Sequence, residues 1–187
     1  MRVFIINILL FTSLLFAGGL QDIDDSIYRS VHDGWHSDFA DKYFCTANAL
    51  GGGEFYLGAN LALMCFGDSK MRDSSKLSSV TVATSIATVM LLKCAVGRPR
   101  PEDANPPRWD SSFPSGHTAA AFAMAYIYGE QYPRLRIPLY LFATSVGLSR
   151  IYLGEHYPSD VLTGAAIGVA SGIIIEKNKN FVLSIGL

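Results

Sequence analysis

Six stretches of the chain carry no aspartate, glutamate, lysine or arginine, and polar segments separate them. A helix needs about 20 apolar residues to cross a bilayer. Several of the stretches are shorter, but polar motif residues extend their ends, and a small bundle accommodates short spans. As a soluble helical core, six such stretches in 187 residues would leave too little polar surface to cover them. The pattern therefore predicts an all-α, single-domain protein over residues 1–187, built as a bundle of six transmembrane helices. The stretches are residues 3–20, 55–67, 77–92, 118–128, 137–149 and 161–175.

The first stretch, within residues 1–20, has two interpretations. Met1 and Arg2 precede an apolar run that ends in Ala17-Gly18-Gly19, a pattern typical of a signal peptide with a small-residue cleavage site. The same run is also typical of a first span that stays in the protein. We expect it to be retained, and in either case the residues that follow emerge on the outer side of the membrane.

Residues 21–45 are polar and acidic, with apolar positions at an early spacing of four, such as Ile23 and Ile27. This spacing predicts one or two amphipathic helices that lie on the membrane surface after the first span. His32 and His36, also four apart, could hold a metal ion. Because no thiol or third histidine is near them in the sequence, we interpret them as an interfacial pair.

The lysines and arginines orient the predicted bundle. With the N-terminus in the cytoplasm, the inner segments carry eight of them and the outer segments carry seven. Three of the outer seven belong to the chemical clusters described below, so the comparison that reports topology is eight against four. The formal net charge of −1 implies no polyanionic partner, and nucleic acid is not expected. The three cysteines show no pairing or metal-ligand pattern, and we interpret them as small apolar residues.

Three short clusters of chemically active residues lie at the outer ends of these stretches. The first has Lys93 at the end of the third stretch and Arg100 seven residues later. Arginine offers forked N–H donors to phosphate oxygens, and lysine offers a point charge. Taken alone, the pair is equally well explained as positive residues that anchor a helix end.

The second cluster, Pro114-Ser115-Gly116-His117, directly precedes the alanine-rich fourth stretch. Ser115 is a favoured helix N-cap, and Gly116 leaves the backbone N–H groups uncovered. Such groups and the helix dipole bind anions, and His117 in the first turn could face the same anion. The alternative is an ordinary cap followed by a histidine without a role.

The third cluster begins with Ser149-Arg150 and continues with His156 and Asp160. The spacing of four lets Asp160 accept a hydrogen bond from the His156 ring, which would fix the tautomer and raise the basicity of the other nitrogen. Pro158 suits the first turn of the last helix. An imidazole oriented in this way can attack phosphorus, whereas the alternative is a histidine–aspartate cap.

Together the clusters have the form Lys-x6-Arg-Pro, Pro-Ser-Gly-His and Ser-Arg-x5-His-x3-Asp. This set, over residues 93–160, resembles the signature of the type 2 phosphatidic acid phosphatase superfamily, and every signature position is present. The six-span layout is similar to that of the family's bacterial membrane members. The N-terminal half matches only in this general layout.

The resemblance implies a role for each residue. His156 would be the nucleophile that forms a phosphohistidine, Asp160 would orient it, and His117 would protonate the leaving alkoxide. Water would then hydrolyse the phosphoenzyme. The cations would replace a divalent metal, so neither a metal nor a cofactor is expected. The phosphate-binding residues would be Lys93, Arg100, Ser115, Gly116 and Arg150.

Three further features of the sequence predict which parts of the chain lie next to this site. Glu54 stands at the outer end of the second stretch, where a carboxylate is costly unless it is paired. We expect Arg98 to be its partner and the pair to have a secondary role, although a glutamate that merely reaches the interface is the alternative. The loop 97–116 is expected to cover the site. Glycines at 164, 168 and 172 share one helix face and predict a close packing ridge.

These expectations describe a lipid phosphate phosphatase of the bacterial inner membrane with its active site on the outer, periplasmic face. Lipid A 1-phosphate, undecaprenyl pyrophosphate, phosphatidylglycerophosphate and phosphatidic acid all fit, and the sequence does not choose among them. The alternative is a membrane protein that binds or transports phospholipid headgroups without catalysis. Vanadate-dependent haloperoxidases share the superfamily, but they are soluble and much larger.

Overall fold

The computed structural model describes residues 18–184, so the predicted first span lies almost wholly outside the described residues. Within this range the chain is helical and contains no strand, which confirms the all-α prediction. Each of the remaining five apolar stretches falls within one helix, except that Gly67, at the end of the first of them, is the cap that follows α4. These helices are α4 (Gly53–Phe66), α5 (Ser69–Val96), α6 (Gly116–Gln131), α7 (Arg136–Tyr152) and α8 (Pro158–Lys177).

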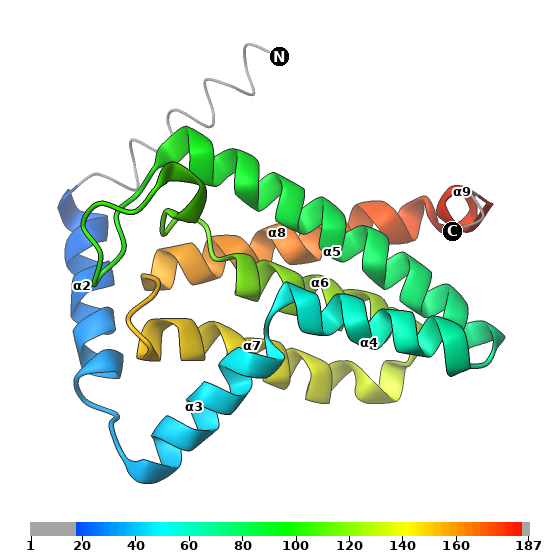
Figure 1. The fold of residues 1–187 in the computed structure, drawn as a ribbon, viewed down its shortest axis with the longest axis horizontal. Helices are drawn as coiled ribbons and strands as arrows, with labels where there is room; N and C mark the ends of the chain where they lie inside the picture. Colours follow the sequence, from blue (N-terminus) through cyan, green and yellow to red (C-terminus); the bar gives the residue numbers. More distant parts are fainter. Residues whose placement is uncertain (1–17, 185–187) are drawn as a thin grey trace.

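Two helices precede this bundle and one short helix follows it. The polar segment predicted as interfacial forms α2 (Gly18–His32) and α3 (Asp38–Leu50). In Figure 1, α2 lies across the ends of the long helices, and α3 runs obliquely beside α7 toward α4. The short helix α9 (Lys179–Ser184) closes the described chain. By length and apolar composition, α5 and α8 are the two described helices that could each cross a membrane unaided. The helical prediction for residues 21–45 is therefore confirmed, and the count of six spans remains a prediction.

Helix α6 forms the centre of the bundle and packs against α4, α5, α7 and α8. It can take this place because its inward positions are alanines, all of them fully buried, so that neighbouring helices approach closely. Small side chains let neighbouring backbones approach closely, and the van der Waals packing that results favours this arrangement. The alanines are Ala119, Ala120, Ala121, Ala123 and Ala125.

The predicted glycine ridge on α8 is confirmed by its contact with α6. A methyl group on Gly164 would lie 2.5 Å from the Ser115 carbonyl oxygen, and one on Gly168 would lie 2.4 Å from the Ala119 carbonyl oxygen. Backbone atoms cannot yield by that much, so only glycine permits this approach. The ridge therefore brings the start of α6 against α8.

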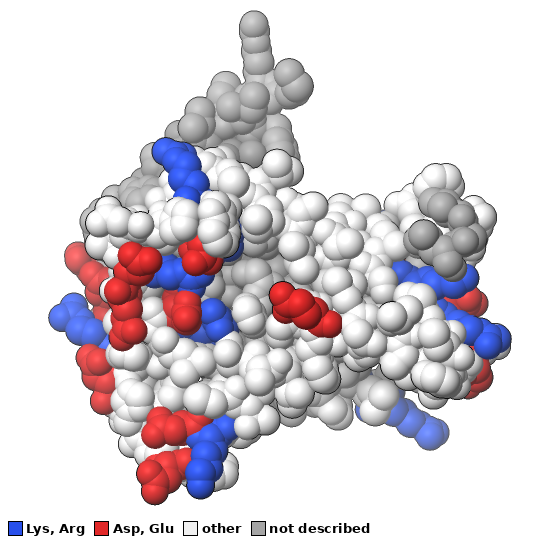
Figure 2. Space-filling view, viewed as in Figure 1, with Lys and Arg blue, Asp and Glu red and all other residues white. Residues whose placement is uncertain are grey.

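The charged residues of the face in Figure 2 gather at the two ends of the molecule. Between the ends the surface is almost free of charge, apart from one acidic side chain. Large apolar side chains are exposed on this bundle, for example Phe66 at 92 % and Leu91 at 74 %. An apolar band of this kind is what a bilayer covers.

Candidate active site

All three predicted clusters meet at one end of the bundle. Lys93 lies in the last turn of α5, His117 in the first turn of α6, and Arg150 in the last turn of α7. His156 follows in the loop between α7 and α8. The charges of Arg150, His156, Arg100 and Lys93 all act on His117, so the tertiary structure joins clusters that are up to 63 residues apart.

His156 is buried, with only 2 % of its surface exposed. Its backbone N–H donates to the Arg150 carbonyl at 3.1 Å, which fixes the loop against the end of α7. Burial lowers the pKa of the His156 ring to about 4, although the charge of Asp160 acts in the opposite direction. At neutral pH the ring is therefore the free base, the form that a nucleophile requires.

Asp160 lies near His156 in a different geometry from the one expected. The His156 Nδ1 is 3.8 Å from Asp160 Oδ2, which is longer than a hydrogen bond. The Ser112 hydroxyl lies between them, 3.5 Å from Nδ1, and donates to Asp160 Oδ2 at 2.5 Å. Asp160 Oδ2 also accepts from the Tyr157 N–H at 2.9 Å and so caps α8. Ser112 was not predicted as a site residue. The only feature of the sequence that could have indicated it is its place beside the second motif.

Arg98 pairs with Asp160, and the expected pair with Glu54 is not formed. Its Nη1 donates to Asp160 Oδ1 at 2.7 Å, and its Nη2 donates to Asp24 Oδ2 at 2.8 Å. The guanidinium also lies over the Tyr157 ring, 4.2 Å from its centroid. Burial opposes the charge of Arg98, but Asp160 and Asp24 outweigh it and raise the pKa further above its ordinary value. The prediction failed because two buried carboxylates accept from the two Nη groups of this guanidinium.

Asp24 of α2 is a further residue that sequence analysis missed. It is 3 % exposed, and it accepts from the Ser159 N–H at 2.9 Å and from the Ser159 hydroxyl at 2.5 Å. Arg98 Nη2 also reaches Gln21 of the same helix at 2.7 Å. The available signal was position, since Asp24 lies seven residues before Val31 and so on its buried helix face. Through Asp24, helix α2 is tied to the first turn of α8.

The N-terminus of α6 has the predicted cap. The Ser115 side chain accepts from the Thr118 N–H at 3.5 Å and from the Thr118 hydroxyl at 2.9 Å. The Ser115 backbone N–H donates to the Asp160 carbonyl at 3.1 Å. This bond sets the first turn of α6, with Gly116 and His117, beside the start of α8. The N–H groups of such a turn are suited to an anion.

Lys93 and Arg150 are buried cations, and the charge of Arg150 acts on Lys93. The Lys93 ammonium donates to the Ser111 carbonyl, and the Ser111 hydroxyl donates back to the Lys93 carbonyl at 3.1 Å. Gly97, with φ at 64°, ends α5 and turns the chain into the loop 97–116. Arg150 Nη1 donates to the Asn48 side chain, while its buried Nε–H has no partner among the described residues. That free donor is available to an anion.

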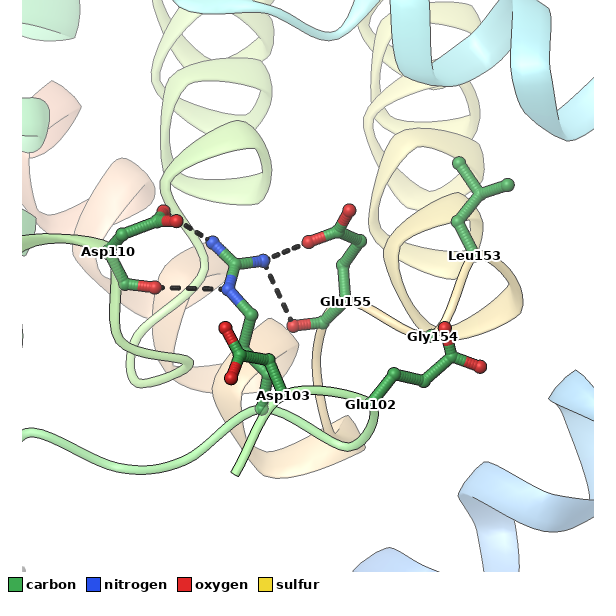
Figure 3. Close-up of a pocket in the computed structure, with 7 residues that line it drawn as sticks. Glu102, Asp103, Asp110, Leu153, Gly154 and Glu155 are labelled. Carbon is green, nitrogen blue, oxygen red and sulfur yellow. Dashed lines mark hydrogen bonds and ion pairs between the residues drawn. The ribbon is translucent and has the colours of Figure 1, made fainter. Parts of the chain in front are cut away.

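Arg100 is held by both sides of the cavity that Figure 3 shows. On one side it donates to the Asp110 carbonyl at 3.0 Å and to the Asp110 carboxylate at 2.6 Å. On the other side it donates to the Glu155 carbonyl at 3.3 Å and to the Glu155 carboxylate. The loop 97–116 thus contributes Asp110 and the neighbouring serines to the site, in agreement with the covering role expected of it.

Glu54 lies in the first turn of α4 and is exposed. Among residues 18–184 it forms no ion pair, so its predicted partnership is wrong in this structure. A methyl group on Gly52 would lie 3.1 Å from Glu54 Oε2 and 3.9 Å from His117 Nε2. Glu54 therefore stands at the edge of the site on the His117 side.

The two histidines of the N-terminal helices contact other parts of the chain. His32 Nδ1 lies 2.7 Å from the Tyr152 carbonyl, and its Nε2 lies 3.0 Å from Glu102. His36 pairs with Asp41 at 3.1 Å. Within the described part of the chain, no group of three or more histidine, cysteine, aspartate or glutamate side chains is arranged to hold a metal ion.

The relatives described here, to which the chain is similar in sequence, are named as phosphatases or diphosphatases. The chain is 30 % identical to the undecaprenyl-diphosphatase BcrC of Bacillus subtilis over 123 residues, which cover 63 % of this chain and 64 % of that protein. It is 42 % identical to a lipid A 1-phosphatase of Porphyromonas gingivalis over 84 residues, which cover 43 % of this chain and 18 % of that protein. The chain thus spans less than two thirds of the length of these relatives.

The fold is similar to a solved structure over nearly its whole length. The crystal structure of the first transmembrane PAP2 type phosphatidylglycerolphosphate phosphatase from Bacillus subtilis superposes with a TM-score of 0.77. The two chains are 24 % identical, and the match covers 94 % of each. A family model for the PAP2 superfamily matches residues 77–180, which include all three motifs and more than half of the chain. With this match and the convergence of its motifs in one site, the chain belongs to the PAP2 superfamily.

Proposed function

We propose that this protein is a metal-independent lipid phosphate phosphatase that works through a phosphohistidine intermediate. The observation that carries the proposal is the site around His156, a buried neutral imidazole beside Asp160 on which the charges of Arg150 and Lys93 act. A protein that only bound phosphate would not need a nucleophile held as the free base. The names of the relatives, a diphosphatase and a lipid phosphatase, support the same reaction class.

In the first step the phosphate of the lipid lies among Lys93, Arg100, Arg150 and the N-terminus of α6. Since Nδ1 of His156 faces Ser112 and Asp160, the opposite ring nitrogen, Nε2, attacks phosphorus. A P–N bond forms and the P–O bond to the lipid breaks. His117, which takes up a proton when the negative phosphate binds beside it, gives that proton to the leaving oxygen. The cations stabilise the charge that the transition state spreads over the phosphate oxygens.

In the second step water hydrolyses the phosphohistidine. His117, now neutral, takes a proton from the water as its oxygen attacks phosphorus. The P–N bond breaks, its electron pair returns to His156 Nε2, and inorganic phosphate leaves. Asp160 and Ser112 hold the ring in one orientation through both steps.

The membrane placement supports a lipid substrate. The uncharged band between the charged ends of the molecule fits a bilayer. The motif residues lie in terminal turns of α5, α6 and α7, at one end of the bundle. We propose six spans with α2 and α3 in the interface, which agrees with the exposed apolar side chains of Ile23 and Phe39. The distribution of lysine and arginine supports a site on the outer face of a bacterial inner membrane.

The test is phosphate release by the detergent-purified full chain from four lipids. These are lipid A 1-phosphate, undecaprenyl pyrophosphate, phosphatidylglycerophosphate and phosphatidic acid. We expect turnover of at least one of them in the presence of a chelator, and inhibition by vanadate because it resembles the transferred phosphate. Loss of activity with the chelator, or indifference to vanadate, would contradict the mechanism.

A second prediction concerns the charge of His156. A histidine with an ordinary pKa near 6.5 is about nine-tenths protonated at pH 5.5. Because burial lowers the pKa of His156 to about 4, its ring should still be neutral at that pH and become charged only below it. The measurement is NMR of the protein with isotopically labelled histidine, in which the His156 signal is assigned by its absence from a His156→Ala variant. A ring already charged at pH 5.5 would argue against a free-base nucleophile.

A further inference from the structure

Glu155 contacts both arginines that the proposed function assigns to the phosphate. Its carboxylate accepts from Arg100 Nη1, and its Oε2 lies 3.5 Å from Arg150 Nη2. Figure 3 shows this side chain pointing at the Arg100 guanidinium from the side opposite Asp110. One carboxylate thus lies between two of the cations that phosphate would need.

The donors of Arg100 are nearly all in use. A guanidinium has five N–H donors, and Asp110 and Glu155 together accept four hydrogen bonds from Arg100. Two of these acceptors are backbone carbonyls, which hold the side chain in place. The other two are carboxylates, and an arriving phosphate can gain a forked contact only if a carboxylate leaves.

Glu155 is built so that its carboxylate can leave while its backbone stays. Its N–H donates to the Arg150 carbonyl at 3.0 Å, and its carbonyl accepts from Arg100. The side chain is 41 % exposed and borders an open cavity of about 240 Å³. The carboxylate can therefore rotate into solvent without disturbing either arginine.

We propose that Glu155 is a specificity-determining residue that competes with the substrate phosphate for Arg100 and Arg150. The proposal rests on the proposed function, since it assumes that phosphate binds between these arginines. A terminal phosphate displaces the carboxylate because it carries a charge of about −1.5 to −2 and three strong acceptor oxygens. A phosphodiester brings one negative charge and two free oxygens, so it gains little by exchange with a carboxylate.

The consequence is selection within a membrane. Lipids with phosphodiester headgroups share the bilayer with the substrate, and each carries a phosphate that the cations could attract. Glu155 offers the arginines an anion of equal charge, so these lipids do not hold the site. Only a terminal phosphate or diphosphate binds the arginines strongly enough to displace the Glu155 carboxylate.

The test replaces Glu155 by glutamine, which keeps the size and removes the charge. With a phosphomonoester lipid, the Glu155→Gln variant should show a KM about three- to tenfold lower, a range typical of the loss of a partly exposed charge pair. Phosphatidylglycerol added to the micelles should inhibit the variant at several-fold lower concentration than the wild type. The Kd for inorganic phosphate should fall by a factor similar to that for KM.

Glu102→Gln is the matched control. Glu102 lines the same cavity but pairs with His32, so its loss should leave KM and inhibition by phosphatidylglycerol unchanged. If Glu155 only orients Arg100, the Glu155→Gln variant will show a raised KM, which is the opposite direction and would overturn the proposal. Unchanged inhibition by phosphatidylglycerol would overturn it as well.

Failure of the proposed function gives a different pattern. If the wild type releases phosphate from no lipid, the phosphatase proposal falls, yet tighter binding of inorganic phosphate by Glu155→Gln would still support competition at the arginines. If the wild type is active and the variant binds phosphate no more tightly, the inference about Glu155 fails and the phosphatase remains.

Discussion

Replacement of His156 by alanine is expected to lower phosphate release at least about 1,000-fold and to leave phosphate binding within a few-fold of the wild type. The ring supplies the nitrogen to which phosphorus is transferred, and loss of a nucleophile removes the covalent route altogether. The cations that hold the phosphate, Lys93, Arg100 and Arg150, do not depend on the His156 side chain for their contacts. The His156→Ala variant should therefore lose phosphate release while it still binds phosphate.

The measurement pairs phosphate release with the Kd for inorganic phosphate, and thermal unfolding in detergent shows that the variant is folded. His36→Ala is the control, because His36 is a half-exposed histidine that pairs with Asp41 away from the site. A His156→Ala variant that keeps turnover would exclude the phosphohistidine. If both the wild type and the His156→Ala variant lack turnover while both bind phospholipid headgroups, the headgroup-binding alternative would be favoured.

Replacement of Arg98 by alanine is expected to destabilise the protein by about 3–5 kcal/mol and to reduce activity. Removal of one member of a buried ion pair leaves an uncompensated charge, and that range is typical of the loss. Here the loss is shared by two buried carboxylates, Asp24 and Asp160. Because Asp160 also lies beside His156, the disturbance reaches the nucleophile.

The measurement is the midpoint of thermal unfolding in detergent, together with phosphate release. Arg108→Ala is the control from the same loop, since Arg108 is exposed and its side chain donates to the Cys94 carbonyl at 3.0 Å, with no carboxylate involved in that bond. Adding Asp24→Asn to Arg98→Ala should recover part of the lost stability, because one of the two stranded charges is then neutral. An additive or larger loss in the double variant would show that the network does not stabilise the protein through charge pairing.

The helices could be predicted because their signals are local. Each apolar stretch from residue 55 onward corresponds to one helix, although the helix bounds differ from those of the stretch. Pro158 begins α8, as a proline in a first turn should. The glycines of α8 could be interpreted from their spacing alone, since that spacing places them on one face. Whether α4, α6 and α7 cross a membrane is not a local property. Each of them is shorter than α5 and α8, the two described helices that are long and apolar enough to span a bilayer unaided.

The sequence led to the expectation that the three motifs meet in one place, but several of their contacts differ from those expected. The motif residues do meet, but Ser112 stands between His156 and Asp160, where a direct hydrogen bond was expected. The expected pair of Arg98 and Glu54 fails because the partners of Arg98 lie 62 and 74 residues away in the sequence. Charge and spacing identify which residues could bind or react with a phosphate. They do not specify which of several carboxylates will pair with a buried cation.

The order of residues along the chain already determined the helices, the close contact face of α8 and the set of groups able to handle a phosphate, because each depends on neighbours within a few positions. Packing in three dimensions decided the rest. It set Asp24 of α2 against Arg98, placed Glu155 between two arginines, and buried His156 deeply enough to keep it neutral. These properties arise from desolvation and from charges brought together by the fold, and neither exists until the helices have packed.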